Sequence, residues 1–101
     1  MTRKELLAEL HPGRTIAEDV LQPLGMSVNA LAKKLHVPTS RLNDIVRGRR
    51  GISADTALRL SRYLGTSGQF WLNLQSNYDL RVAEHGKGGA IRKQVHPRDT
   101  A

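Results

Sequence analysis

The segment from Ser27 to Gly48, SVNALAKKLHVPTSRLNDIVRG, constrains the fold most, because its apolar residues recur at helical spacing on both sides of one short break. Ser27 is placed to cap a first helix, and Pro38 ends that helix and favours the start of a second. The spacing therefore predicts two short helices that share one core and meet at a tight turn, the arrangement of a helix-turn-helix. The apolar positions are Val28, Leu31, Ala32 and Leu35 in the first helix, and Leu42, Ile45 and Val46 in the second.

The second helix of such a pair leaves its outer face free to enter the major groove of DNA. Arg41 and Asn43 have side chains suited to bidentate contacts with guanine and adenine. Thr39 or Ser40 could instead cap the helix, and Asp44 would repel phosphate unless it accepts from a cytosine amine or holds a neighbouring arginine. We expect base contacts from this helix, with the candidate residues Thr39, Ser40, Arg41, Asn43 and Asp44.

Three arginines follow the second predicted helix in the sequence RGRRG. The glycines allow the backbone to turn at the helix end, and the arginines suit contacts with phosphate. A solvated turn with cations at a helix C-terminus would have the same sequence, but the preceding helix pair favours the phosphate interpretation. We expect phosphate contacts from Arg47, Arg49 and Arg50, together with Ser27 at the start of the first helix.

The net charge of +7 over 101 residues favours an anionic partner for a single small domain. Residues 1–22 carry three cations and four acids, a net of −1, so residues 23–101 carry 13 cations and five acids, a net of +8. The N-terminal end is therefore not expected to bind DNA. The chain has no cysteine and no apolar run long enough to cross a bilayer, so we expect a cytoplasmic protein without disulfides or membrane contact.

The rest of the chain also has helical patterns, and no stretch alternates like a strand, so we predict an all-α fold. A short helix is expected within residues 2–10, followed by a turn at His11-Pro12-Gly13 and a helix over residues 15–24 that Pro23 interrupts near its end. Ser53 should cap a further helix that stops at Gly65. A last helix should start near Ser67.

Trp71, in the last predicted helix, is most simply a core residue, although an interface position remains open. The glycines in GKGG, at positions 86, 88 and 89, are expected to end the ordered chain. We therefore predict three parts. Residues 1–13 form an N-terminal segment, residues 14–85 form the helix-turn-helix DNA-binding and dimerisation domain, and residues 86–101 form a flexible basic tail.

An enzyme is not expected from this sequence. The four histidines, at positions 11, 36, 85 and 96, have neither i, i+4 pairing nor HExxH-like spacing, and GKGG lacks the context of a phosphate-binding loop. We expect no metal and no other cofactor. RNA binding or non-specific coating of nucleic acid ranks below duplex DNA, because no aromatic residue interleaves the arginines of residues 47–50.

The runs HPG, PLGMS, GRRGISADTALRLSRYLGTS and QFWLNLQSNYDL flank the helix pair between His11 and Leu80. With these motifs the chain resembles the HigA-type antitoxins, a branch of the XRE (lambda-repressor-like, Cro-like) family. The resemblance implies a lambda-repressor-like five-helix domain. It also implies a homodimer that represses its own operon at an inverted-repeat operator and binds and neutralises a RelE-like, mRNA-cleaving toxin of the HigB type. The dimer contacts implied by position are Ile52, Ser53, Ala54, Tyr78 and Leu80.

One alternative keeps the DNA-binding function alone, because some chains of this family act as regulators without a toxin. The basic chain is also unexpected for the partner of a basic, RNA-binding toxin. The N-terminal acids could supply local complementarity or could simply solvate exposed helix faces. These acids are Glu5, Glu9, Glu18 and Asp19.

Overall fold

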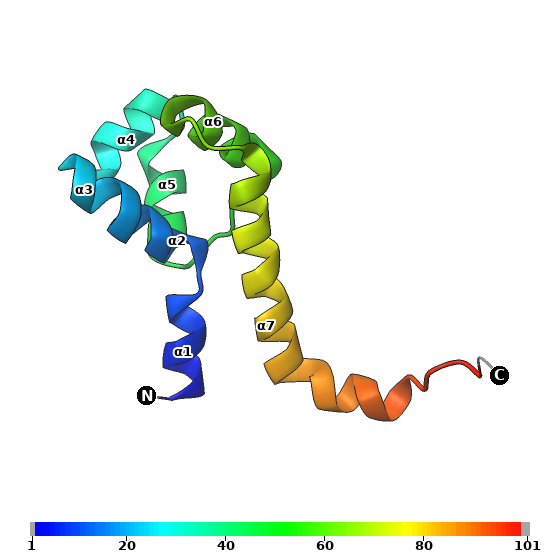
Figure 1. Cartoon of the computed structure of the whole chain (residues 1–101). Helices are drawn as coiled ribbons and strands as arrows, with labels where there is room; N and C mark the ends of the chain where they lie inside the picture. The colour runs from blue at the N-terminus through cyan, green and yellow to red at the C-terminus, as the bar shows by residue number, and fades with distance from the viewer. Residues whose placement is uncertain (1, 100–101) are drawn as a thin grey trace.

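The computed structural model describes residues 2–99, and these residues form helices and connecting turns without a strand (Figure 1). The expected all-α fold with a helix-turn-helix is confirmed. No helix in this part of the chain combines the length and the apolar character that crossing a membrane requires. The elements are α1 (Arg3–Glu9), α2 (Pro12–Thr15), η1 (Ile16–Leu21), α3 (Gln22–Leu24), α4 (Val28–Leu35), α5 (Thr39–Val46), α6 (Ala54–Leu64) and α7 (Gly68–Gln94).

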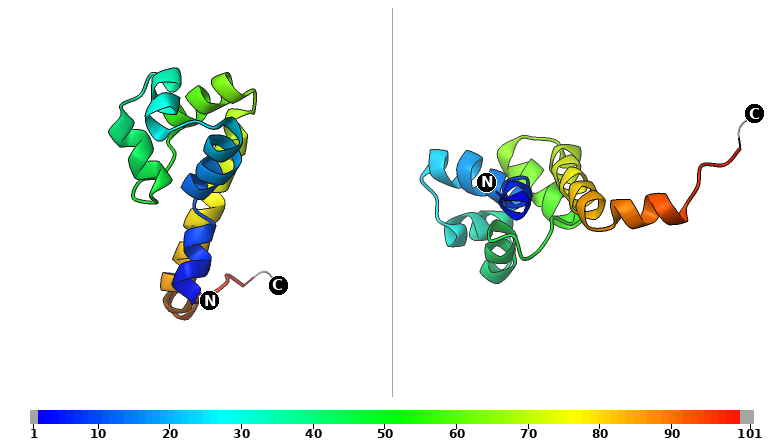
Figure 2. Two further views of the ribbon diagram at one scale, coloured as in Figure 1. Left: turned by 90° about the vertical axis from the view of Figure 1, so that its left-hand side faces the viewer. Right: turned by 90° about the horizontal axis from the view of Figure 1, so that it is seen from below.

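The short N-terminal helix α1 begins with a capping box. The Thr2 hydroxyl accepts from the Glu5 backbone amide at 3.1 Å, and the Glu5 carboxylate accepts from the Thr2 amide at 3.3 Å. No residue of α1 is buried, and the helix lies alongside α7 (Figure 2). The caps therefore stabilise a helix that the core does not hold.

The segment His11-Pro12-Gly13 starts a helix, and our expectation of a turn there was wrong. Pro12 occupies the first helical position, where its fixed φ suits a helix and its missing N–H costs nothing. His11 caps the helix, because its Nδ1 accepts from the Gly13 amide at 2.9 Å. Its ring is buried and contacts Tyr78 edge to face, with ring centroids 4.7 Å apart.

The pKa of His11 lies below its ordinary value because burial disfavours the imidazolium, and this effect outweighs the opposing attraction of the Asp79 carboxylate. The unfolded chain therefore binds the proton more readily, so the free energy of unfolding should fall as the pH drops through the ordinary imidazole range. His11→Asn keeps an acceptor that can cap the helix but does not titrate. Urea unfolding between about pH 5 and pH 8 should show a flatter dependence for this variant. The same slope in both proteins would contradict the prediction, and His85→Asn, at an exposed position, is the control.

The next three elements form one continuous helix from Pro12 to Leu24. Its middle, η1, is π-helical, and the Gln22 amide donates to the Ala17 carbonyl five residues earlier. The wider turn precedes Pro23, which has no amide hydrogen to donate. The expected helix over residues 15–24 is confirmed, but it starts earlier, and Pro23 lies within it. Its buried stripe comprises Ile16, Val20 and Leu21.

The predicted helix pair is present as α4 and α5. The Ser27 hydroxyl caps α4 by accepting from the Ala30 amide at 3.0 Å, as expected. His36 ends α4 in the left-handed region at φ 57°, an unusual conformation for a residue other than glycine. One core joins both helices to η1, α6 and α7; its buried apolar residues are Ile16, Val20, Leu21, Leu31, Ala32, Leu35, Leu42, Ile45, Ile52, Ala57, Leu60 and Trp71.

The two C-terminal helices confirm some of the expected boundaries. Ser53 caps α6, which ends at Gly65 with φ 79°, and Ser67 caps α7. Gly86, Gly88 and Gly89, which were expected to end the ordered chain, do not end the helix, because α7 continues through all three to Gln94 and bends on the way (Figure 1). Glycine weakens a helix but ends it only where it turns left-handed, and these three glycines keep negative φ angles. Flexibility of this segment stays a prediction.

Candidate nucleic-acid interface

Helix α5 lies at an outer edge of the helical body (Figure 2). Leu42 and Ile45 are fully buried and fix α5 against the core. All five predicted base-reading residues lie on the remaining faces of this one helix. Thr39 and Ser40 are exposed, and Arg41, Asn43 and Asp44 are partly exposed. The structure thus presents a single polar helix face of the kind that enters a major groove.

Thr39 does not cap α5, because Pro38 occupies the N-cap position and makes no side-chain hydrogen bond there. The Thr39 hydroxyl instead donates to Asn29 Oδ1 at 2.8 Å. Asn29 lies in the first turn of α4, so this bond ties the starts of the two helices together. Sequence reasoning missed Asn29, since a partner ten residues away on another helix leaves no local pattern.

Arg41 is held by an acidic residue that sequence reasoning placed only as a helix-start residue. Its Nη1 donates to Asp55 Oδ2 at 3.0 Å, and Arg59 Nε donates to the same oxygen at 2.9 Å. The hydrogen bond from Arg59 is the largest cause that lowers the pKa of Asp55 below its ordinary value, and Arg41 adds to it. Asp55 is therefore ionised at neutral pH and binds two guanidinium groups.

The remaining predicted residues lie near the two ends of the helix pair. Arg47, Arg49 and Arg50 are exposed, and Gly48 turns the backbone at φ 78°. Arg49 Nη1 lies 3.9 Å from Asp44 Oδ1, which matches the expectation that Asp44 could hold a neighbouring arginine. Ser27 is exposed, but its hydroxyl accepts the capping hydrogen bond of α4. A phosphate contact from this hydroxyl therefore has to use its hydrogen as the donor.

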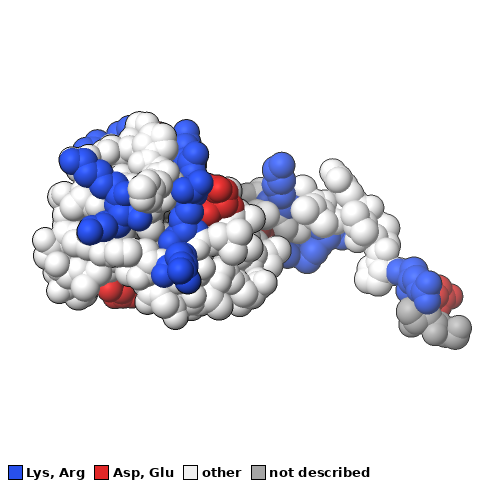
Figure 3. Space-filling view, turned by 90° about the horizontal axis from the view of Figure 1, so that it is seen from above, with Lys and Arg blue, Asp and Glu red and all other residues white. Residues whose placement is uncertain are grey.

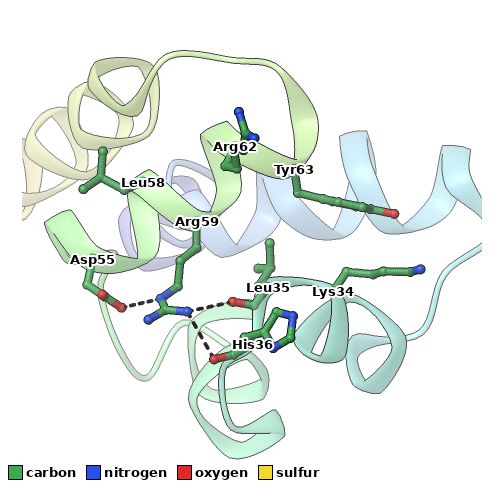
Figure 4. Close-up of a pocket in the computed structure, with 8 residues that line it drawn as sticks. All are labelled: Lys34, Leu35, His36, Asp55, Leu58, Arg59, Arg62 and Tyr63. Atoms are coloured by element: carbon green, nitrogen blue, oxygen red, sulfur yellow. Dashed lines mark hydrogen bonds and ion pairs between the residues drawn. The ribbon is translucent and has the colours of Figure 1, made fainter.

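Further cations lie on the adjoining surface of α4 and α6. Figure 3 shows Lys and Arg side chains gathered over this end of the molecule, beside one acidic cluster. Figure 4 shows the groove between the two helices, in which the Arg59 side chain points from α6 towards the C-terminal end of α4. The groove is lined by Lys34, Leu35, His36, Asp55, Leu58, Arg59, Arg62 and Tyr63. Within residues 2–99, no group of three or more His, Cys, Asp or Glu side chains is arranged to hold a metal ion.

The five residues expected at a dimer interface lie in different environments. Ile52 belongs to the core of its own protomer, and its amide donates to Gln75 Oε1 at 2.7 Å. Ser53 caps α6, and Tyr78 packs against His11. Ala54 is exposed, and Leu80 is 62% exposed. Leu80 and Ala54 are thus the apolar members of the set that are exposed, while Tyr78 is half-buried. Dimerisation itself stays a prediction.

Known proteins are similar to this chain both in sequence and in the arrangement of helices. A family model described as Helix-turn-helix matches residues 18–71. Virulence-associated protein I of Dichelobacter nodosus is 55% identical over 84 residues, which cover 83% of this chain and 78% of that protein.

Two solved structures are similar over almost the whole chain. One is an addiction module antidote protein of the HigA family from Coxiella burnetii, with 48% identity, a TM-score of 0.84 and coverage of 87% of this chain and 96% of that chain. The other is the Pseudomonas aeruginosa antitoxin HigA with the higBA promoter, with 47% identity, a TM-score of 0.85 and coverage of 86% and 95%. By its helix-turn-helix, its sequence and its fold, the chain belongs to the XRE family of helix-turn-helix proteins, in the branch of the HigA-type antitoxins.

Proposed function

We propose that this protein is a DNA-binding antitoxin that represses its own operon as a homodimer and neutralises a RelE-like, HigB-type toxin by direct binding. The observation that carries the proposal is the polar outer face of α5, in a fold that matches a HigA antitoxin solved with promoter DNA. The cations after α5 supply the phosphate contacts that non-specific affinity requires.

A dimer presents two α5 helices to one face of the duplex. To meet successive major grooves, the two helices have to lie about 34 Å apart, so we propose an inverted-repeat operator with half-sites one helical turn apart. Leu80 and Ala54 offer exposed apolar surface for such an interface. Ile52 is buried in its own protomer, so its contribution is to fix the loop between α5 and α6.

The N-terminal acids are only partly available to a basic toxin. Glu5 caps α1, and Glu18 forms an ion pair with Arg14 on the same helix. Among the described residues, Glu9 and Asp19 make no ion pair and are exposed. We propose these two carboxylates as the acidic contribution to toxin binding, since steering depends on local charge and not on the net charge of the chain.

The toxin partner is tested by purifying the tagged protein from its native cells and identifying what co-purifies. The proposal predicts a stoichiometric small basic protein that stops growth and translation when expressed alone and loses this effect when this chain is co-expressed. If DNA is recovered without a protein partner at high yield, a stand-alone XRE-family repressor becomes the better account.

Asn43→Ala should weaken binding to the operator by about 1–3 kcal/mol while leaving binding to random DNA nearly unchanged. The reason is that Asn43 lies on the open part of α5, where its amide can pair with an adenine edge. Fluorescence anisotropy with labelled operator and scrambled duplexes measures both affinities. Asn77→Ala, at an exposed position of α7, is the matched control. Equal losses on both duplexes would rule out base recognition by Asn43.

Arg50→Ala should weaken binding to operator and random DNA alike, and should reduce the dependence of log affinity on log salt by about one unit. Arg50 is exposed beside the C-terminal end of α5, where a phosphate contact releases a counterion. Titrations at several salt concentrations give the slope, and Arg3→Ala, on the acidic N-terminal end, is the control. If the dependence of log affinity on log salt were unchanged, Arg50 would make no phosphate contact and would belong to a solvated turn.

A further inference from the structure

One carboxylate joins α5 to α6 beside the candidate DNA-binding surface. Asp55 lies in the first turn of α6, and its Oδ2 accepts from both Arg41 and Arg59. Arg41 is on α5, fourteen residues earlier, so the contact depends on the fold. The helix start alone explains why an acidic residue is favourable at this position, but it does not explain why a base-reading candidate is bound to it.

Arg59 fixes the position of the Asp55 carboxylate. It lies one turn further along α6, and its Nη1 donates to the Leu35 carbonyl at 3.1 Å and to the His36 carbonyl at 3.3 Å (Figure 4). These are carbonyls at the end of α4 that lack helical partners. Arg59 therefore connects the turn of the helix-turn-helix to α6 and leaves little freedom to the carboxylate that holds Arg41.

The contact uses one of the five N–H donors of Arg41. The remaining donors stay available for a bidentate contact with a guanine edge. At the same time Asp55, whose side chain is 56% exposed, places a negative charge against the Arg41 guanidinium, and this charge repels a phosphate that approaches the same guanidinium. One carboxylate thus orients the arginine and also disfavours its use as a non-specific phosphate contact.

Resting on the proposed function, we propose that Asp55 is a specificity-determining positioning residue, which holds Arg41 in the orientation that reads a base and keeps it from binding phosphate. Immobilising a long side chain in advance removes part of the cost of ordering it on DNA. Loss of Asp55 should therefore weaken operator binding roughly 2- to 10-fold, from the ordering cost of one such side chain. Binding to random DNA should become tighter, because a repulsive charge is removed.

The test uses a pool of random duplexes of about 30 base pairs, long enough for two half-sites. Wild-type protein, Asp55→Asn and Arg41→Ala are each used to enrich the pool, and base preferences are read by sequencing. We expect Asp55→Asn to lose preference at the same base position as Arg41→Ala, with the other positions unchanged. A protein combining both substitutions should show no further loss at that position, because Asp55 acts through Arg41.

Glu18→Gln is the matched control, since it removes a carboxylate from another arginine–carboxylate pair, which lies within the continuous helix from Pro12 to Leu24. Its base preferences should equal those of wild type, and thermal unfolding should show that every variant folds. If wild-type protein enriches no sequence, both this inference and the proposed operator binding are overturned. If wild-type protein enriches an operator and Asp55→Asn keeps every base preference, only the role of Asp55 is overturned.

Discussion

Trp71→Ala is expected to lower the free energy of unfolding by about 3–5 kcal/mol, a large fraction of the stability of a small domain. The indole is 2% exposed and belongs to the core that joins α7 to the other helices. Its Nε1 donates to Thr66 Oγ1 at 2.8 Å, so the substitution removes a hydrogen bond together with a large buried apolar surface. The truncated side chain leaves a cavity that the short helices cannot close without moving.

Urea denaturation followed by circular dichroism measures this loss. Phe70→Ala is the neighbouring control, because Phe70 is 43% exposed and touches Trp71 only edge to face. We expect it to cost less than half as much. A Trp71→Ala protein that stayed fully stable but lost its oligomeric state would assign the indole to an interface, against the burial seen in a single chain.

Gly13→Ala is expected to destabilise the protein by about 3 kcal/mol, at the upper end of overpacking effects. A Cβ on Gly13 would overlap the Ile45 carbonyl oxygen and would lie 2.8 Å from the Ile45 carbonyl carbon and 3.0 Å from the Val46 Cα. All three are backbone atoms of α5, so the clash cannot be relieved by a side-chain rotation. Either α2 or α5 has to shift, and a shift of α5 moves the whole candidate base-reading face.

The expected readouts are therefore a lower unfolding midpoint and weaker operator binding in the same variant. Gly86→Ala is the matched control, because Gly86 lies within α7 and a Cβ there meets no atom within 4 Å. Alanine should stabilise that helix by about 0.4–1 kcal/mol. If Gly13→Ala were as stable as Gly86→Ala, the close approach of α2 to α5 would be refuted.

Features that depend on neighbouring residues in the sequence could be predicted. The apolar spacing of residues 28–46 gave α4 and α5, and local capping chemistry gave the start of α4 at Ser27, the start of α6 at Ser53 and its end at Gly65. The polar face of α5 followed from the same periodicity, because the positions left over by the core are the exposed ones.

Features that depend on the packing of distant segments could not be predicted. Gly13 was placed in a turn, since nothing near it in the sequence reveals that the backbone of Ile45 packs against it. The contact of Arg41 with Asp55 likewise requires the angle between α5 and α6. The effect of the glycines in α7 was predicted wrongly for a different reason. Glycine permits the left-handed conformation that ends a helix, but it does not require that conformation.

The position of Trp71 in the chain also orders events during synthesis. The ribosome makes the helix-turn-helix before α7, yet the core that supports the helix-turn-helix is completed by Trp71, near the start of α7. At elongation rates of about 5–20 residues per second, about one to five seconds pass between the synthesis of the last residue of α5 and the synthesis of Trp71. A product that ends before α7 lacks this closure, so we expect prematurely terminated chains to be cleared by proteases before they can compete for DNA.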